Sequence, residues 1–549
     1  MKAVMAVLIV LVMLVGWALL PTSASATIPY HGYTYSSDRE VRSIAGYVYA
    51  GSIDGTEDPA IGAFNRPESL YFAEDGMLYI VDSGNNRIVQ LDRDRRYVQS
   101  FGDAEGPGAL SEPKGVYVKA DGTVYAADTK NGRIVVFDAA GAFVRDYPKP
   151  ESPLIGSTFS YSPSKLVLDK RDYMYVVSEG NTQGLLQIDP TGQFRGFYGA
   201  NHVGFSWSRL FVKLIATEAQ QRKLSAIVPA EFSNLELDDE GFMYTTTLGE
   251  EVNQLKRLSP VGVDTLNLGT ARPYGDLYTV GPFAMASFIG VTVSPEGIIS
   301  ALDLQTSKVF QYDKLGNFLF SFGGTGEQNG LFVTPSDLKQ DLNGNLYVVD
   351  RGRNRIDMFR TTPFADLVHE ASTLYVDGRY SEAEALWQEV LRVNGNYEMA
   401  YIAIGKAMYK AERYREAMDY FELAGARADY SVAFKEYRKD FVREHFAVFA
   451  IGAILLFVAL RWGAPRLIRA IGARGGRASW SRRANGWAGE QGSGRGNERV
   501  SGQSGGQISG QAKARSSGQA DGQADGEASS QGSGQTGAQG PGAGKELTR

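Results

Sequence analysis

The chain of 549 residues contains no cysteine, which excludes disulfide bonds and thiolate metal sites. Histidine is scarce as well: the chain has four, scattered along the sequence at His31, His202, His369 and His445. A multi-histidine metal centre is therefore not expected. The sequence also lacks a nucleophile elbow, a phosphate-binding loop and kinase motifs. The most recognisable enzyme signatures are thus missing.

The net charge of −6 is unevenly distributed along the chain. From Arg461 onward there are about thirteen Lys and Arg against six Asp and Glu, so the rest of the chain carries about −13. A nucleic-acid-binding protein needs a basic folded domain. Here the folded part is acidic and the basic part is a tail, so we expect no nucleic-acid partner.

The N-terminus has the pattern of an export signal. Met1-Lys2 is followed by an apolar run over 3–20 and by Ala24-Ser25-Ala26, which predicts a signal peptide at 1–26. An uncleaved anchor is the alternative. In both cases the residues that follow are expected to be exported.

A second apolar run, over 446–460, predicts a transmembrane helix at 446–462, which is about 17 residues long when Arg461 and Trp462 at its end are counted. It is followed by seven arginines and no acid, namely Arg461, Arg466, Arg469, Arg474, Arg477, Arg482 and Arg483. Positive charge stays on the cytoplasmic side. We therefore expect a single-pass cell-membrane protein with extracellular N-terminal domains. A basic segment at 463–483 and a disordered Gly/Ser/Gln-rich cytoplasmic tail at 484–549 follow the span.

A long phrase repeats through the first two thirds of the chain. The segment PESLYFAEDGMLYIVDSGNNRIVQLDRDRRYVQSFG at 67–102 returns at 113–147 and, less closely, further along. A period of about 46–50 residues with four short strands predicts a β-propeller. The hairpin turns carry Gly76, Gly122, Gly241, Gly297 and Gly344, with Lys170-Arg171-Asp172 in the third repeat. Glycine there suits a two-residue turn.

Counting these turns predicts a mainly β fold with six blades over 33–362 and an insertion at 201–229. The sixth repeat ends early, at Phe359. We expect the N-terminal segment 33–51 to supply its missing strand and so close the ring.

An acid recurs five positions before a base, and we expect each pair to clamp a hairpin. The pairs are Asp82/Arg87, Asp128/Arg133, Asp303/Lys308 and Asp350/Arg355. The motif V-D-x-x-N-x-R-I at 81–88, the Asp-Gly-x-x-Tyr turn and the closing Phe-Gly resemble the NHL family. The resemblance covers about 60% of the chain. It implies a six-bladed propeller that binds proteins, glycans or RNA. Ser178 and Thr246 depart from the pattern, because they stand where the acid is expected.

From residue 363 the apolar period changes from 2 to 3.6, which predicts helices. Tyr380 and Tyr414, Ala383 and Ala417, and Trp387 and Phe421 are each 34 residues apart. This spacing resembles tetratricopeptide repeats, which are helix–turn–helix units. We expect such repeats at 363–443, with a last helix over 431–442 capping the stack.

The first residues of the innermost strands should rim the propeller channel, and they are Glu68, Lys114, Lys165, Asn234, Ser287 and Asp337. Lactonases and lyases on six-bladed propellers hold a divalent ion there, and Glu68, Asn234 and Asp337 could imitate that. Lys114 and Lys165 would repel a cation, so we expect no metal and no cofactor. The mixed charge suits a hydroxyl-rich or zwitterionic ligand, and solvated charges without a ligand are the alternative.

A second candidate site is the loop with Arg272, Tyr274, Asp276 and Tyr278, whose side chains could stack on and hydrogen-bond a sugar. A structural turn is the alternative.

These patterns favour a membrane-anchored binding protein. The propeller would recognise an extracellular glycan or partner protein, and the helical repeats would contact a neighbouring membrane complex such as a transporter. The alternative is a surface enzyme of lactonase or lyase type with a metal in the channel.

Overall fold

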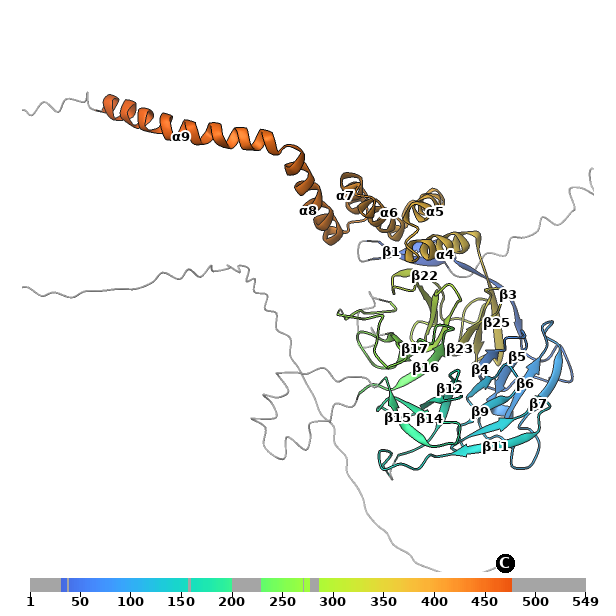
Figure 1. Ribbon diagram of the computed structural model, residues 1–549. Helices are drawn as coiled ribbons and strands as arrows, with labels where there is room; N and C mark the ends of the chain where they lie inside the picture. Colours follow the sequence, from blue (N-terminus) through green and yellow to red (C-terminus); the bar gives the residue numbers. More distant parts are fainter. Residues whose placement is uncertain are drawn as a thin grey trace, which may run out of the picture. The chain divides into compact units, whose positions relative to one another are not determined.

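The computed structural model describes residues 31–36, 39–156, 159–199, 229–269, 271–276 and 286–475. Within them the chain is mainly β: a six-bladed propeller is followed by six helices (Figure 1). The predicted signal peptide, the insertion as far as Val228, Tyr278 and the chain beyond residue 475 lie outside the described residues.

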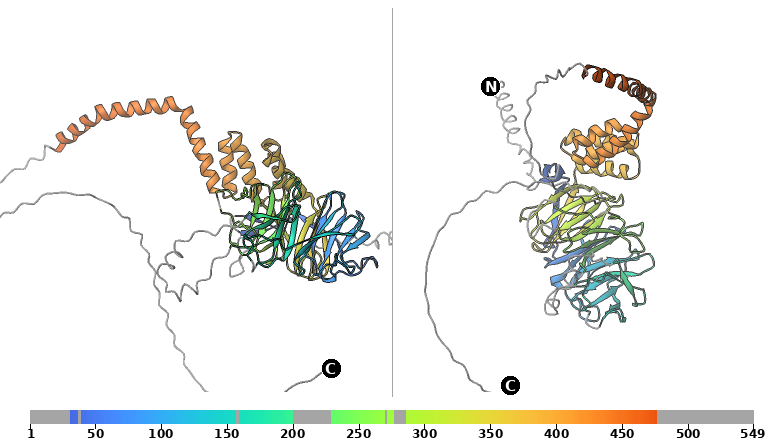
Figure 2. Two further views of the ribbon diagram at one scale, coloured as in Figure 1. Left: turned by 60° about the horizontal axis from the view of Figure 1, so that its bottom comes forward. Right: turned by 90° about the vertical axis from the view of Figure 1, so that its left-hand side faces the viewer.

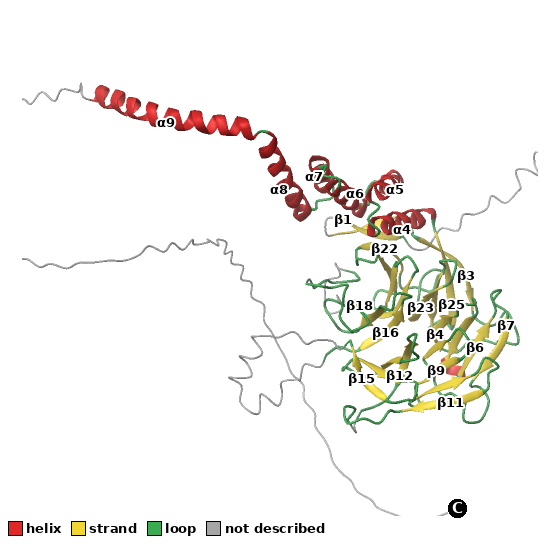
Figure 3. Ribbon diagram, viewed as in Figure 1, coloured by secondary structure: helices red, strands yellow, loops and turns green. Residues whose placement is uncertain are grey.

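Each blade is an antiparallel sheet, and in blades one to three the four strands follow one another in sequence (Figure 3). Blade one has β4 (Pro67–Phe72), β5 (Leu78–Asp82), β6 (Arg87–Leu91) and β7 (Tyr97–Phe101). Blade two has β8 (Gly115–Val118), β9 (Val124–Asp128), β10 (Arg133–Phe137) and β11 (Phe143–Pro148). Blade three has β12 (Pro163–Leu168), β13 (Met174–Ser178), β14 (Leu185–Ile188) and β15 (Phe194–Tyr198).

The other three blades depart from this plan. Blade four has three described strands, β16 (Phe232–Leu237), β17 (Met243–Thr247) and β18 (Leu255–Leu258). Blade five has β19 (Phe288–Val293), β20 (Ile299–Asp303), β21 (Lys308–Tyr312) and β22 (Phe318–Gly323). Blade six has β23 (Pro335–Gln340), β24 (Leu346–Asp350) and β25 (Arg355–Thr361).

The hairpin turns are one residue longer than predicted. In blade one Ala73 N bonds Met77 O and Gly76 N bonds Ala73 O, which leaves three residues in the loop. Gly76 has φ +83°, the left-handed conformation that ends such loops. In blade three Asp172 takes this position at φ +62°.

The N-terminal segment closes the ring as predicted, but with only part of its length. Strand β3 (Tyr47–Ile53) pairs with β25 and completes blade six. The residues before it form β1 (Gly32–Ser36) and β2 (Arg39–Ser43), which extend blade five through the pair Tyr33–Ser321.

The acid–base clamps are confirmed in blades one and two, where Arg87 Nε lies 2.9 Å from Asp82 and Arg133 Nε lies 2.8 Å from Asp128. In blade five Asp303 accepts from the backbone N–H groups of Ser287 and Thr306.

The prediction is wrong in blade six. There Arg353, not Arg355, bonds Asp350, at 2.7 Å. Arg355 pairs with Asp357, a buried aspartate in β25 at the position that Val89 and Val135 hold in the first two blades. The extra buried carboxylate attracts the arginine that the motif assigns to Asp350.

The helices are α4 (Pro363–Val376), α5 (Tyr380–Val393), α6 (Glu398–Lys410), α7 (Tyr414–Leu423), α8 (Arg427–Glu444) and α9 (Phe446–Gly475). Tyr380 and Tyr414 begin α5 and α7, so the 34-residue spacing is present in the helices themselves. Ala383 and Ala417 are fully buried, which allows close helix approach. Figure 2 shows the helices that follow the propeller from two further directions.

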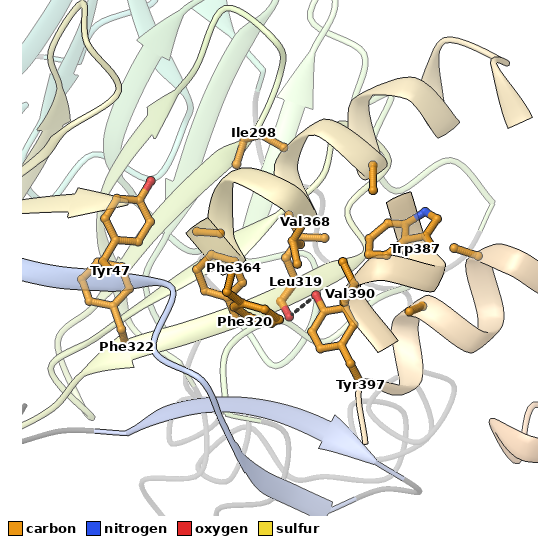
Figure 4. Close-up of a cluster of buried hydrophobic side chains, with 14 of the residues drawn as sticks. Tyr47, Ile298, Leu319, Phe320, Phe322, Phe364, Val368, Trp387, Val390 and Tyr397 are labelled. Atoms are coloured by element: carbon orange, nitrogen blue, oxygen red, sulfur yellow. Dashed lines mark hydrogen bonds between the residues drawn. The ribbon is translucent and has the colours of Figure 1, made fainter. Parts of the chain in front are cut away.

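One hydrophobic core joins the propeller to the helices (Figure 4). Phe320 of blade five lies against Phe364 of α4, with ring centroids 6.1 Å apart. Tyr397 stacks on Trp387 at 6.1 Å and donates a hydrogen bond to Leu319 O at 2.8 Å. The helical region therefore shares its core with blade five.

Helix α9 contains one candidate membrane span among the described residues, Phe446–Arg466, with a mean hydropathy of 2.1 and no buried part. Its length and composition suffice to cross a bilayer.

Candidate ligand site at the channel mouth

The innermost strands set two rings of side chains in the channel, because most of them carry a bulge near their start. In blade one Pro67 pairs with Asp82 and Ser69 with Val81, so Glu68 is the extra residue. In blades three to six the pairing register of the innermost strand shifts in the same way, and the extra residues are Ser164, Ser233, Ile289 and Ser336. These bulge residues, with Glu68 and Lys114, form the outer ring. Ser69, Gly115, Lys165, Asn234, Gly290 and Asp337 form the inner ring.

Asp337 is the centre of the inner ring. Its carboxylate is fully buried and accepts from Lys165 Nζ at 2.6 Å, Ser69 Oγ at 2.5 Å and Asn234 Nδ2 at 2.9 Å. These donors come from blades three, one and four. The network therefore ties the channel together across its width, and it leaves the carboxylate well satisfied.

The next ring along the same strands is also polar. Glu236 of β16 pairs with Lys339 of β23 and accepts from Thr292 Oγ1 at 3.3 Å. Burial disfavours the ammonium of Lys339, but the carboxylates of Glu236 and Asp337 outweigh it and raise the Lys339 pKa. Tyr71 and Tyr117 pack at 5.3 Å in the same ring. With Lys165 and Asp337, the channel thus holds two cations and two anions, which come from blades three, four and six.

Above the inner ring lies a cavity of about 360 Å³, whose outer wall is charged. Arg351 lies 3.2 Å from Glu68, and Lys114 lies 2.7 Å from Glu179. Glu231 accepts from Gly180 N at 2.7 Å. Each of these contacts bridges neighbouring blades. Lys114 and Glu179 remain 30% and 48% exposed, so a ligand can reach them.

The opposite wall of the cavity is apolar. It is built from Leu248, Ile289 and Leu304 of blades four and five. Leu304 is 36% exposed, whereas the ring of Phe232 at the same wall is only 4% exposed. The mouth is therefore amphipathic, with ion pairs from blades six, one, two and three facing an aliphatic surface. Its one aromatic ring offers little surface for stacking.

The structure brings together five of the six predicted rim residues, but at two levels. Glu68 and Lys114 lie in the outer ring, while Lys165, Asn234 and Asp337 lie in the inner ring. Ser287 does not line this cavity, and its N–H bonds Asp303.

The side chains of the inner ring do not fit a divalent cation. Asp337 and Asn234 are engaged with each other, and Lys165 is the nearest charge to the carboxylate. An ammonium 2.6 Å from the only inner-ring carboxylate competes directly with a metal ion. Among the described residues no group of three His, Asp or Glu could hold one.

In the 272–278 loop, for which a sugar site was predicted, the ring of Tyr274 is buried and so is not exposed for stacking. Tyr274 is 3% exposed, packs at 5.2 Å against Tyr312 and donates to Asn267. The guanidinium of Arg272 bonds Leu315 O at 2.6 Å, and Asp276 lies 4.0 Å from Lys308. Tyr278 lies outside the described residues. These contacts of Tyr274 and Arg272 fit the alternative, a structural turn, better than a sugar-stacking surface.

Sequence reasoning missed the partners that complete the mouth: Ser69, Glu179, Glu231 and Arg351. Arg351 and Glu179 directly follow the second strand of their blades, at equivalent positions. In a propeller such positions adjoin the start of the innermost strand. The position directly after the second strand of a repeat could therefore have identified Arg351 and Glu179 from the sequence.

Similarity to known proteins was found among solved structures. No family model matches the chain, and no curated protein matches it. Similar solved structures include virginiamycin B lyase from Staphylococcus aureus, with 13% identity over 58% of this chain and 88% of that chain and a TM-score of 0.36. Hydrazine synthase from Kuenenia stuttgartiensis has 12% identity, coverages of 57% and 99% and a TM-score of 0.35. A Bacteroides thetaiotaomicron protein of unknown function has 14% identity, coverages of 59% and 80% and a TM-score of 0.39.

Proposed function

We propose that this chain is a membrane-anchored binding protein whose propeller takes a segment of a partner protein at the channel mouth. The observation that carries the proposal is the amphipathic cavity. Its charged wall, with Lys114, Glu179, Glu68 and Arg351, faces an aliphatic wall. A peptide segment offers apolar side chains next to charges and backbone amides, and it can match both walls.

The lining weighs against the other ligand class expected from the sequence, a glycan. Sugar sites present exposed aromatic faces, against which the apolar face of a pyranose packs. At this mouth Phe232 is buried, and the second candidate, Tyr274, is buried elsewhere. Ion pairs that exchange partners suit a zwitterionic peptide chain better.

The enzyme alternative, a lactonase or lyase with a channel metal, draws no support from the donors. It would need a free carboxylate, and Asp337 already accepts from Ser69, Asn234 and Lys165. A polar plug that is fully satisfied is better suited to holding the ring rigid than to catalysis.

The proposal places the propeller outside the cell, on α9 as a single span. It rests on the export signal at 1–26, on the apolar helix over Phe446–Arg466 and on the arginines that follow. Protease added to intact cells should remove the propeller and leave a tail epitope protected. A tail epitope that is accessible from outside would reverse the topology.

The chain provides a matched pair of lysines for testing the site. Lys114 and Lys119 flank β8 at its two ends, and each makes an ion pair of 2.7 Å. Their exposures are 30% and 29%. They differ in position only: Lys114 lines the mouth and Lys119 lies beyond the other end of the strand.

The experiment is selection of random peptides on the detergent-solubilised full chain, in parallel with a glycan array. We expect enriched peptides that combine an aliphatic residue with charges. Lys114→Ala should weaken their binding by about tenfold, which corresponds to about 1.4 kcal/mol, and Lys119→Ala should leave it unchanged. Equal loss in both variants, or glycan binding that depends on Lys114, would refute the peptide proposal.

A further inference from the structure

The charges that line the channel mouth do not balance. Each Lys or Arg of the lining lies beside a carboxylate and is compensated within the fold. The pairs are Arg351 with Glu68 at 3.2 Å, Lys114 with Glu179 at 2.7 Å and Lys165 with Asp337 at 2.6 Å. One more carboxylate, that of Glu231, lines the cavity, and among the described residues it has no ion-pair partner. The mouth therefore carries one uncompensated negative charge.

The carboxylate of Glu231 is positioned by the fold. Its Oε2 accepts from Gly180 N of blade three at 2.7 Å, and the backbone O of Glu231 accepts from Leu248 N at 3.1 Å. Gly180 directly follows Glu179, so two carboxylates approach each other, and Lys114 pairs with only one of them. Within the described part of the chain Oε1 of Glu231 accepts no hydrogen bond, which leaves it available to a donor from outside.

Aliphatic side chains of blades four and five line the same cavity as Glu231. Leu248 directly follows β17, Leu304 directly follows β20, and Ile289 is the bulge residue of β19. All three keep part of their surface open to the cavity, since none of them is fully buried. A group that satisfies this part of the mouth needs a cationic end and an apolar stem.

We propose that the mouth selects its partner segment by a Lys or Arg side chain, whose charged end pairs with Glu231 and whose methylene stem lies on Leu248 and Leu304. Long basic side chains lay their stems on apolar surface while the charged head keeps polar partners. The bound cation restores the charge balance of the mouth. The inference rests on the proposed function, because it names the residue type by which the cavity recognises a peptide segment.

A basic side chain fits better than the other cations that a carboxylate attracts. A calcium ion takes about six or more oxygen ligands, whereas Glu231 offers one free oxygen in a cavity whose other wall is aliphatic. The ammonium of a peptide N-terminus has no methylene stem to cover Leu248 and Leu304. Lys and Arg supply both the charge and the stem.

The first test compares short peptides that differ in one side chain, on the detergent-solubilised full chain. The probes are acetylated and amidated peptides of leucine and serine that carry one lysine, one acetyl-lysine or one glutamate at the same place. Acetylation removes the charge and keeps the stem. We expect the lysine peptide to bind about tenfold more tightly than the acetyl-lysine peptide, measured by fluorescence anisotropy. Equal binding of the two would overturn the inference and leave the peptide function intact.

Variants assign the preference to Glu231. Glu231→Gln keeps an acceptor for Gly180 N but removes the charge, so the preference for lysine should disappear. Glu231→Arg should reverse it in favour of the glutamate peptide. The matched control is Glu74→Gln, because Glu74 is an exposed carboxylate in the turn after β4, also without an ion pair among the described residues, and it should keep the preference. A preference that survives Glu231→Gln would overturn the inference.

A second measurement uses the wild-type chain and does not require that a whole peptide binds. A carbodiimide joins a carboxylate to an amine that lies against it, and the probe is acetyl-lysine methylamide with a free side-chain amine. Mass spectrometry should find coupling at Glu231 about fivefold above that at Glu74, because a bound amine has a raised effective concentration. Coupling at Glu231 that is no greater than at Glu74 would overturn the inference. If Glu231 couples preferentially but no peptide binds, the peptide function fails and the contact with a basic side chain stands.

Discussion

The carboxylate of Asp337 lies fully buried in the channel beside the Lys165 ammonium, whose side chain is 13% exposed. Removing one partner of such a pair leaves the other charge buried and uncompensated. We therefore predict that Asp337→Asn lowers the free energy of unfolding by about 3–5 kcal/mol, measured by urea denaturation of the purified chain.

Two further variants test whether the loss of stability comes from the uncompensated charge of Lys165. Adding Lys165→Met to Asp337→Asn should recover most of the loss, because an uncharged pair of similar volume has no uncompensated ammonium. Glu105→Gln, at an exposed loop position, should change little. If the double variant is no more stable than Asp337→Asn, the ion pair is not the reason for the loss.

We predict that His369 of α4 makes the junction between propeller and helices sensitive to acid. Gln311 donates to Tyr47 and Ser300, so its oxygen accepts from His369 Nε2 at 2.7 Å. Burial lowers the His369 pKa to about 4, although Asp366 and Glu296 oppose this. The unfolded chain therefore binds the proton more readily than the folded chain.

Stability should consequently be complete above pH 6.5 and fall as the pH drops towards 4, by up to about 3 kcal/mol. His369→Gln should remove that part of the pH dependence, and His445→Gln should leave it in place. The measurement is the melting temperature between pH 7.5 and 4.5. Identical pH profiles for the wild type and His369→Gln would contradict the assignment.

At the scale of residues, most of the residues that line the channel could be predicted from the sequence, but not how far from the channel mouth each one lies. Lys114 follows Pro113 directly, whereas Lys165 stands two residues after Pro163. The bulge in the strand register, which the repeat pattern does not reveal, decides which of these two positions lies at the mouth and which lies in the inner ring. Likewise, Asp357 diverts Arg355 from the clamp because of a contact between residues on one strand.

At the scale of elements, the features that could be predicted most reliably from the sequence are those that depend on its repeats. Blade number, the closing strand and the 34-residue helix spacing each depend on patterns that recur, so one irregular copy does not hide them. The hairpin of β1 and β2 on blade five could not be foreseen, because it occurs once and pairs with a strand about 290 residues away. The helices α5 to α7 lend themselves to a direct test of packing.

Trp387 is 1% exposed in α5, and its ring nitrogen has no hydrogen-bond partner among the described residues. Its contribution is therefore packing alone, chiefly against Tyr397. We predict that Trp387→Ala costs about 3–5 kcal/mol and Trp387→Phe clearly less. Hydrogen exchange should show faster exchange in α5 and α6 first. Unchanged exchange there would mean that the Trp387 contacts carry little of the stability of these helices.

At the scale of the whole molecule, the shared core makes the helical region part of the folding unit of the propeller. Thr362 accepts from Ala365 N as the cap of α4, and its N–H bonds Gly46 O, so α4 begins directly where β25 ends. Two helical hairpins bury little on their own, and blade five supplies the missing surface. The helices are thus expected to move with the propeller.

This arrangement predicts that the propeller is unstable without its helices. Ending the chain at Thr362 uncovers Tyr47, Leu319 and Phe320, which are now fully buried, and each costs about 1.5–3 kcal/mol when exposed to water. Ending it at Ala426 keeps α4 to α7 and should preserve a single cooperative melt. We expect the shorter fragment to melt at a clearly lower temperature and to aggregate, as scattering would show. If the two fragments melted at the same temperature, the propeller would be an independent domain and α4 to α7 a separate attachment.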